Sequence, residues 1–424
     1  MQDKLTTSPL TKAQKIRSIV AASSGNLVEW FDFYIYAFTA IYFAHTFSTS
    51  DNPIMQQIVA FGVFAAGFFM RPIGSLVFGS LADKVGRKKS MVFSVILMAL
   101  GSFIIAALPS KDIVGDFAII LLLIARLIQG LSVGGEYGIA ATYLSELASE
   151  GKRGFYSSFQ YVTLIGGQLL AVASISIMLL ILNEEQMKDF GWRILFVVGG
   201  LLALGSLFVR SIMNESATEL HKHEDRGTLK ALFTSWKPFL IVVGITAGGS
   251  LAFYTITTYT KTFIVNVGLI DKTLSNNIYL IALFVLMLIQ PLFGAIGDKI
   301  GHKNSLLIFS VLGFLGIYPI FMALKTADDT WSILGLVLLL FIILSFYTSV
   351  AGIFKAKLFP EHIRALGTGL GYAIPNAIFG GSAPFVALSF KEAGNENGFF
   401  IYVGALMVVV FFISLLLPKK AELN

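Results

Sequence analysis

Seven charged residues lie within long apolar stretches of this 424-residue sequence, namely Glu29, Asp32, Arg71, Arg126, Glu136, Lys261 and Lys355. In a lipid bilayer such a charge costs at least about 2.5–3.5 kcal/mol, so it is normally paired or faces a water-filled cavity. A buried carboxyl group can exchange a proton, because burial favours its neutral form and a nearby guanidinium favours its charged form. A guanidinium binds a carboxylate through two parallel hydrogen bonds, whereas an ammonium acts as a point charge. These residues therefore have the chemistry for proton exchange and anion binding.

The first apolar stretch contains two acidic residues at the depth expected for a proton site. Asp32 follows Arg17 by 15 residues, which is about 22 Å along an α-helix. Glu29 lies three residues earlier and therefore on the same helical face. We predict that Asp32 carries the proton and that Arg126 is its partner, with Glu29 and Glu136 as alternatives. The competing interpretation is a permanent Asp32–Arg126 ion pair that joins two helices.

Three basic residues are predicted to bind a dicarboxylate: Arg71 and Lys355, from opposite halves of the chain, and Lys261 as a third cation. Each has an alternative. Arg71 can serve the structure alone, and the two lysines, which precede Pro360 and Asp271, can extend to the membrane surface. The remaining candidates are neutral polar residues that either contact the substrate or join helices, namely Gln160, Gln168, Tyr254, Thr257, Thr258, Gln290, Tyr347 and Asn376.

The elements that must position these residues are membrane-spanning helices. Hydrophobic residues make up 56% of the chain and charged residues only 13%, about half the charged fraction of a soluble domain. Runs of about 20 mostly apolar residues are typical of transmembrane helices. We predict twelve spans, at residues 18–45, 54–82, 90–108, 117–144, 155–182, 192–213, 238–265, 274–297, 304–324, 331–357, 365–390 and 398–417.

The distribution of Lys and Arg predicts the orientation. With both termini in the cytoplasm, and with basic residues at the ends of spans counted on the side that they face, the cytoplasmic side holds 21 of the 31 Lys and Arg residues, the outer side six and the span interiors four. This bias follows the positive-inside rule. It explains the net charge of +6 without a nucleic-acid partner. The first apolar stretch contains Glu29 and Asp32 and leads into further spans, which excludes a cleavable signal peptide.

An internal repeat divides the chain into two halves. Gly79-Ser-Leu-Ala-Asp-Lys-Val-Gly-Arg-Lys88 recurs as Gly294-Ala-Ile-Gly-Asp-Lys-Ile-Gly-His-Lys303, 215 residues later. Arg153-Gly154 and Arg364-Ala365 form a second pair, at an offset of 211. The repeat predicts an all-α membrane protein with two pseudo-symmetric six-helix bundles, 1–213 and 238–424, joined by a cytoplasmic linker at 214–237.

Several classes of chemistry are disfavoured. The chain has no cysteine, which excludes disulfides, thiolate metal sites and cysteine nucleophiles. Its five histidines show no metal-ligand spacing, and no paired glycine precedes Lys-Ser or Lys-Thr as in a phosphate loop. We therefore predict no metal, no cofactor and no enzymatic activity. A membrane enzyme or signal receptor is the alternative from another class, and the chain offers no sizeable soluble domain for it.

These motifs resemble a known family. The sequences Gly79–Lys88 and Arg126-Leu-Ile-Gln-Gly130, on twelve spans, are similar to those of the major facilitator superfamily. Its metabolite:proton symporter branch resembles the chain at three further segments, 23–34, 69–74 and 134–137. The likeness extends to the bacterial 2-oxoglutarate (alpha-ketoglutarate) permeases through 157–168, 345–349 and 376–381.

The resemblance implies a secondary active transporter that imports a small dicarboxylate, 2-oxoglutarate, with protons, by alternating access. The alternative is proton symport of another metabolite: citrate, shikimate, or proline and betaine. The implied setting is a bacterial inner membrane, with the lipid bilayer, the organic anion and protons as partners, no nucleic acid, and the monomer as the working unit. Related sugar:proton carriers pair an acid of the first span with an arginine of the fourth, as predicted for Asp32 and Arg126.

The resemblance also implies a latch on the cytoplasmic side. Asp83 is expected to bind a helix N-terminus or a neighbouring arginine, and Arg87 a carboxylate such as Glu146. Arg153 and Asp298 are the other implied gating residues. Topology alone is the competing explanation, because Lys and Arg also mark the cytoplasmic side. The second repeat departs from the family pattern at His302, where arginine is usual, and a weaker clamp is expected there.

Overall fold

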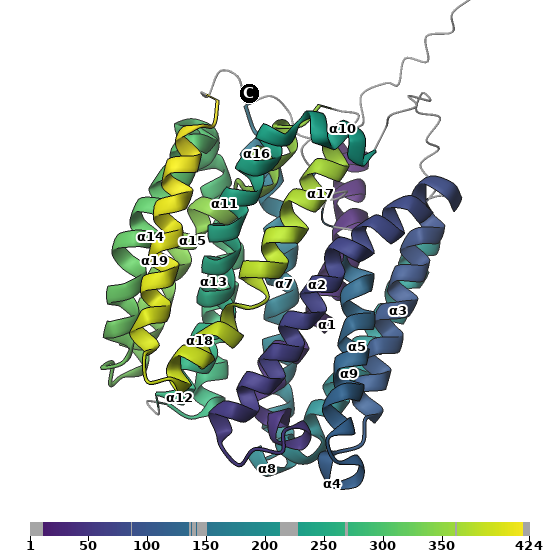
Figure 1. Ribbon diagram of the computed structural model, residues 1–424, viewed down its shortest axis with the longest axis vertical. Helices are drawn as coiled ribbons and strands as arrows, with labels where there is room; N and C mark the ends of the chain where they lie inside the picture. The colour runs from purple at the N-terminus through teal and green to yellow at the C-terminus, as the bar shows by residue number, and fades with distance from the viewer. Residues whose placement is uncertain are drawn as a thin grey trace, which may run out of the picture.

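The computed structural model describes residues 12–85, 87–134, 137, 141, 151–212, 228–267, 270–360 and 363–418. Within these ranges the chain forms helices and their connections, without a β-strand. Twelve long helical rods run roughly side by side (Figure 1). The predicted all-α architecture with twelve spans is confirmed, and most helix ends lie within a few residues of those predicted. The predicted end of the span 117–144 lies outside the described residues.

Six rods and three short elements make up the first half of the chain. The rods are α1 (Lys12–Phe47), α2 (Pro53–Val85), α3 (Arg87–Ala107), α5 (Phe117–Val133), α7 (Arg153–Ile181) and α9 (Trp192–Ile212). The short elements are α4 (Lys111–Val114), α8 (Glu184–Gln186) and the π-helix η1 (Met187–Gly191). Asn183 starts α8 with a capping box, because its side chain accepts from Gln186 N while the Gln186 side chain accepts from Asn183 N.

The second half repeats the pattern, with three rods that bend at an interruption. The elements are α10 (Leu229–Thr234), α11 (Trp236–Tyr254), η2 (Thr255–Tyr259), α12 (Thr260–Asn266), α13 (Lys272–Ile300), α14 (His302–Leu324), α15 (Thr330–Thr348), α16 (Ala351–Lys357), α17 (Arg364–Pro375), η4 (Asn376–Gly380), α18 (Ala383–Glu392) and α19 (Glu396–Leu415). Asp271 and Asp329 cap α13 and α15 by accepting hydrogen bonds from backbone N–H groups of the first turn. The π-turns η2 and η4 interrupt two rods midway, as π-turns often do at functional sites.

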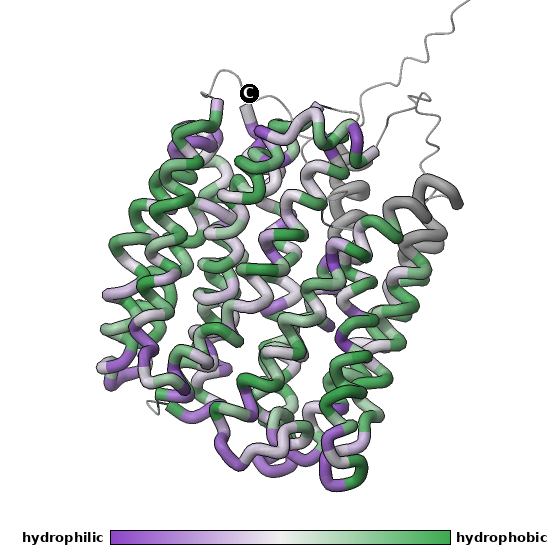
Figure 2. Tube along the Cα trace, in the orientation of Figure 1, coloured by the Kyte–Doolittle hydropathy of each residue, from purple (hydrophilic) through white to green (hydrophobic). Residues whose placement is uncertain are grey.

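The outer surface of the bundle suits lipid. Among the described residues, nine helices are long and apolar enough to cross a membrane, and Val92–Ala107 and Phe117–Val133 are shorter apolar helices. Large apolar side chains such as Leu180 and Ile181 are exposed, which water would disfavour and hydrocarbon accepts. Figure 2 shows hydrophilic segments gathered at both ends of the helices. The protein is a multi-pass membrane protein.

The rods form two bundles that meet along two seams. In one seam α7 packs against α13, and in the other α2 packs against α17, η4 and α18. The purple-to-teal helices of the first bundle lie beside the green-to-yellow helices of the second (Figure 1). We call the end with α10 and α16 the linker end, and the end with α4 and α8 the α8 end. The candidate functional residues lie mainly in and beside these seams.

Candidate functional site

Asp32 is held by side chains from two other helices of the first bundle. Its Oδ1 accepts a hydrogen bond from Ser102 Oγ of α3, and its Oδ2 accepts one from Gln129 Nε2 of α5 at 2.7 Å. Gln129 Nε2 also lies 2.9 Å from Ser102 Oγ. Helix α9 passes so close that a β-carbon at Gly199 would lie 2.4 Å from Asp32 Oδ1. The carboxyl group is therefore buried and tightly packed.

Arg126 reaches Asp32 through an amide and not directly. Its Nη1 donates to Gln129 Oε1 at 2.7 Å, and the other end of the same amide donates to Asp32. No direct Asp32–Arg126 ion pair occurs among the described residues, so the predicted partnership takes the form of a bridged contact. The guanidinium also lies 4.3 Å from the ring centroid of Tyr36 and 4.6 Å from that of Phe33, where cation–π attraction stabilises its charge.

Arg71 lies on α2 in an aromatic cage. Its guanidinium carbon is 4.0 Å from the ring centroid of Phe68, 4.4 Å from Phe33 and 4.9 Å from Trp30. Phe33 therefore contacts both arginine groups of the first bundle. Arg71 is 2% exposed, and its Nε and Nη2 have no hydrogen-bond partner among the described residues. Unpaired buried donors of this kind are rare, and these two remain able to donate to a ligand.

Lys355, the corresponding cation of the second bundle, is surrounded by neutral groups. Its ammonium donates to Tyr137 Oη at 3.0 Å and lies 3.5 Å from Tyr347 Oη. The rings of Tyr372, Tyr137 and Phe354 are 4.7–5.6 Å away. No described carboxylate forms an ion pair with it. The side chain is completely buried, so the alternative that it extends to the membrane surface is wrong.

Lys261 is buried as well, and it joins the two bundles. Its ammonium donates to Asn276 Oδ1 at 2.7 Å and lies 4.8 Å from the ring centroid of Phe38. Asn276 Nδ2 in turn donates to Ser176 Oγ of α7 at 2.7 Å. The side chain is 2% exposed, so it does not extend to the surface either. Its neighbours again include no described carboxylate.

A pocket opens between the bundles, bordered by residues of α1, α2, the end of α5, and α17. Its lining comprises Asn26, Glu29, Trp30, Arg71, Val133, Gly134, Tyr137, Gly369, Tyr372 and Ala373. Glu29 is thus the acidic residue beside Arg71, whereas Glu136 lies outside the described residues. Tyr137 and Tyr372, one from each bundle, stack with ring centroids 3.4 Å apart.

The neutral candidates separate into two groups. Gln160 Oε1, Gln168 Oε1, Thr258 Oγ1 and both amide atoms of Asn376 are buried and lack a hydrogen-bond partner among the described residues. Such atoms suit contacts with a polar ligand. Gln290, by contrast, donates to Ser345 Oγ and accepts from Thr348 Oγ1. Thr257 donates to the Phe253 carbonyl oxygen and lies 3.3 Å from Gln168 Nε2. Gln290 and Thr257 therefore form hydrogen bonds between helices.

Two tyrosines among the candidates border the same region. Tyr254 ends α11 and packs edge-on against Phe68, with centroids 5.2 Å apart. Tyr347 lies beside Lys355. The π-helix η2 follows Tyr254 and changes the direction in which later side chains point. Tyr254 and Lys261 nevertheless both contact α1, at Tyr34 and Phe38 respectively.

At the linker end, the second repeat motif joins the bundles. Asp298 Oδ1 accepts from Gly154 N at 2.7 Å, and Oδ2 accepts from Phe155 N at 3.0 Å. The carboxylate thus caps α7, where the helix dipole favours negative charge. A β-carbon at Gly154 would lie 2.6 Å from Gly294 O, and one at Gly294 the same distance from Gly154 O, so glycine is required at both positions.

The other gating candidates give a partial picture. His302 Nε2 lies 3.2 Å from Asp298 Oδ1, so the residue that departs from the family pattern still contacts the motif acid. Arg153 starts α7, and its Nε has no partner among the described residues. The side chains of Asp83, Arg87 and Glu146 lie outside the described residues.

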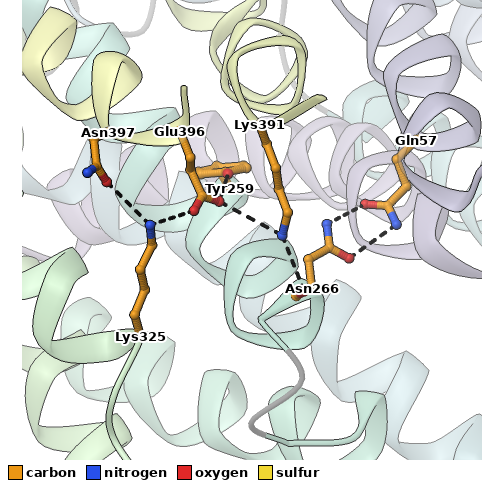
Figure 3. A network of polar contacts seen from close by, with 7 residues as sticks. All are labelled: Gln57, Tyr259, Asn266, Lys325, Lys391, Glu396 and Asn397. Atoms are coloured by element: carbon orange, nitrogen blue, oxygen red, sulfur yellow. Dashed lines mark hydrogen bonds and ion pairs between the residues drawn. The ribbon is translucent and has the colours of Figure 1, made fainter. Parts of the chain in front are cut away.

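Polar contacts also join the bundles at the α8 end (Figure 3). Gln57 of α2 and Asn266 of α12 exchange two hydrogen bonds, at 3.0 and 3.3 Å. Lys391 donates to the Asn266 carbonyl oxygen at 3.2 Å and approaches Glu396, which Lys325 reaches at 2.7 Å. Both ends of the central region are therefore bridged in this structure.

Sequence reasoning missed four of these residues. Gln129 stands three residues after Arg126, on the same helical face, and this spacing was available as a signal. Ser102 and Phe33 have no distinguishing pattern. Tyr372 meets Tyr137 from 235 positions away in the sequence, and only the packing of the bundles brings them together.

Comparison with known proteins supports the class that the fold and the buried charges define. Residues 22–384 match the model of the Major Facilitator Superfamily. The chain belongs to this family and is a membrane transporter, not an enzyme. It is 50% identical to the alpha-ketoglutarate permease of Escherichia coli over 420 residues, which cover 99% of this chain and 97% of the permease.

One further relative and one solved structure match the chain at lower sequence identity. The citrate-proton symporter of Klebsiella pneumoniae is 32% identical over 386 residues, which cover 90% of this chain and 87% of the symporter. The partially occluded, inward-open structure of the xylose transporter XylE from E. coli superposes with a TM-score of 0.77. That match covers 97% of this chain and 99% of XylE at 17% sequence identity, so it bears on the fold alone.

Proposed function

We propose that this protein imports a small dicarboxylate, 2-oxoglutarate, together with protons. The observation that carries the proposal is the pair of buried cations Arg71 and Lys355, one from each bundle, which border the same two tyrosines. Lys355 forms no ion pair with a described carboxylate, and Arg71 keeps Nε and Nη2 without a hydrogen-bond partner among the described residues. A buried cation without a counter-charge and buried donors without acceptors are both costly, and an arriving dicarboxylate would supply one carboxylate to each residue. The 50% identity to an alpha-ketoglutarate permease supports this choice of anion.

The cations also argue against a zwitterionic substrate such as betaine or proline. A quaternary ammonium needs an aromatic cage or a carboxylate. The cage of Trp30, Phe33 and Phe68 already contains the Arg71 guanidinium. Citrate and shikimate both carry a carboxylate and remain the competitors to test.

We assign the proton to Asp32. The group has two donors, Ser102 and Gln129, which suit the ionised form. Ser102 Oγ also lies 3.2 Å from the Met98 carbonyl oxygen. If Asp32 takes a proton, the Ser102 hydroxyl can turn to Met98 and accept from the acid. Both protonation states then keep their hydrogen bonds, while Gln129 transmits the change to Arg126.

Alternating access follows if the bundles 1–213 and 238–424 rock against each other around the site, with 214–237 as their tether. The Asp298 cap on α7 supports a latch at the linker end. By the internal repeat, Asp83, Arg87, Glu146 and Arg153 would complete that latch. We place the linker end in the cytoplasm of a bacterial cell, at the inner membrane, on the Lys and Arg bias. Because one chain supplies both bundles, we propose that the monomer transports.

Uptake into proteoliposomes tests the proposal. Labelled 2-oxoglutarate should accumulate when the outside is made acidic and should only equilibrate without the gradient. Excess unlabelled 2-oxoglutarate should abolish uptake, whereas betaine should not compete. Accumulation that ignores the pH gradient would refute proton coupling. Stronger competition by citrate or shikimate than by 2-oxoglutarate would refute the substrate.

A further inference from the structure

A stacked tyrosine pair crosses the gap between the bundles. The rings of Tyr137 and Tyr372 are nearly parallel, at 8°, with centroids 3.4 Å apart. Tyr137 follows α5 of the first bundle, and Tyr372 belongs to α17 of the second. Both are less than 9% exposed. Because the stack joins the two bundles, they cannot separate at this point until the two rings part.

The same pair borders both proposed substrate cations. Lys355 lies over the two rings, 4.7 Å from the Tyr372 centroid and 5.1 Å from the Tyr137 centroid. Arg71 lines the pocket that both tyrosines line. The Tyr137 hydroxyl accepts a hydrogen bond from Lys355 Nζ at 3.0 Å. The stack is thus the shared boundary of the two cation sites.

The bond that ties Lys355 to this stack is replaceable. A phenol oxygen is a neutral acceptor, and a carboxylate makes a charge-assisted hydrogen bond that is about twice as strong. A carboxylate that arrives at Lys355 would therefore displace Tyr137. A molecule that brings a second carboxylate to Arg71 would also occupy the pocket that Tyr137 and Tyr372 line.

We propose that Tyr137 is a positioning residue that holds Lys355 until substrate arrives, and that the Tyr137–Tyr372 stack is a gate which a dicarboxylate opens. This inference rests on the proposed function, and it goes further by naming the inter-bundle contact that the substrate breaks. It also explains why the site would select a dicarboxylate, because a monocarboxylate can bind only one of the two cations, Arg71 or Lys355.

The absence of cysteine from the chain allows a clean accessibility test. Val133→Cys places one thiol in the pocket lining, and the purified full-length protein in nanodiscs is labelled with a maleimide. In this parent, saturating 2-oxoglutarate should raise the labelling rate at least about threefold, and acetate should not. Tyr372→Leu should label at the raised rate without ligand. Tyr372→Phe keeps the ring and should behave as the parent.

Tyr137→Phe separates a positioning role from a structural one. The variant keeps the stack and removes the bond to Lys355, so binding no longer has to displace the phenol. The affinity for 2-oxoglutarate should rise about twofold to tenfold, the worth of one hydrogen bond, while maximal uptake falls. A merely structural role would leave affinity unchanged or lower it.

The outcomes distinguish the two proposals. Equal labelling of Tyr372→Leu and the parent without ligand, with both proteins folded by thermal melting, would overturn the gate. Reduced affinity in Tyr137→Phe would overturn the positioning role. If the parent binds no 2-oxoglutarate, the proposed function fails, and so does the proposal that a dicarboxylate opens the stack. The labelling of Tyr372→Leu without ligand still decides whether the stack closes the space between the bundles.

Discussion

In the first bundle the buried cation Arg126 reaches an acid, whereas in the second bundle the buried cations Lys261 and Lys355 reach only neutral groups. Gln129 bridges Arg126 and Asp32 by hydrogen bonds, so the positive and negative groups are linked within one bundle. The two lysines rely on Asn276, tyrosine hydroxyls and aromatic rings. The described contacts of these two buried lysines leave their positive charges without a counter-charge.

This difference teaches how the two tasks of a symporter can be divided. A charge pair within one bundle can take up and release a proton without outside help. Isolated cations are costly to bury, and their cost falls when an anion arrives. We therefore propose that proton exchange takes place in the first bundle, and that the buried lysines of the second bundle, together with Arg71, attract the anion. The following changes should break or sharpen this division, in order of decreasing effect.

Asp32→Asn should abolish accumulation of 2-oxoglutarate against its gradient while counter-flow exchange continues. The amide has nearly the shape of the acid and cannot carry the proton charge. Uptake driven by an imposed pH gradient and exchange in preloaded proteoliposomes measure the two activities. Asp112→Asn, at an exposed position on α4, is the matched control. Accumulation in the Asp32 variant would move the proton site elsewhere.

Lys355→Met should weaken substrate binding by about 30-fold to 1000-fold, as expected when one partner of a buried charge pair is removed. Exchange and accumulation should fall together, in contrast to Asp32→Asn. Binding is measured by equilibrium dialysis of labelled 2-oxoglutarate. Lys357→Met, two residues along the same helix, should bind normally. Unchanged affinity after Lys355→Met would remove the second bundle from the site.

Arg71→Lys should raise the KM for 2-oxoglutarate about tenfold to 100-fold, because an ammonium keeps the charge and loses the two-pronged hydrogen bond. Initial rates over a range of substrate concentrations give KM and the maximal rate separately. A loss in maximal rate with the same KM would point to a structural role for Arg71.

Gln129→Leu should lower pH-driven uptake about tenfold and leave exchange largely intact, because Arg126 loses its bridge to Asp32. The comparison is with Gln290→Leu, which removes a buried amide of the second bundle bonded to Ser345 and Thr348. That change should lower the thermal melting temperature without a selective loss of proton coupling. Equal uncoupling in both variants would contradict the division between bundles.

Asp298→Asn should have the smallest effect, a shift of about fivefold towards opening at the linker end. It removes a charge from the N-terminus of α7, worth about 1 kcal/mol, and keeps only one of the two acceptors that Gly154 N and Phe155 N use. Spin-label distances between α7 and α13 measure the population. Transport rates should change by less than in the four variants above, and an unchanged distance distribution would argue against a latch.

The linear pattern predicts the scaffold well, because each feature it uses is local. Runs of apolar residues identify the spans wherever the chain lies in the bilayer, and the two copies of the glycine–aspartate motif reveal the repeat without knowledge of any contact. Asp32, Arg71 and Lys355 are prominent for the same reason: a charge in an apolar run is visible in one dimension.

The sequence by itself therefore determined the membrane class, the twelve spans, the two halves and the short list of buried charges. Only the tertiary structure decided which of these charges meet. It inserted Gln129 between Asp32 and Arg126, turned Lys355 and Lys261 inward from the surface, and stacked Tyr137 on Tyr372. The reason is physical: pairing depends on the packing of helices distant in sequence, where a shift of a few ångströms exchanges one partner for another. Hydropathy and spacing along a single helix carry no information about that packing.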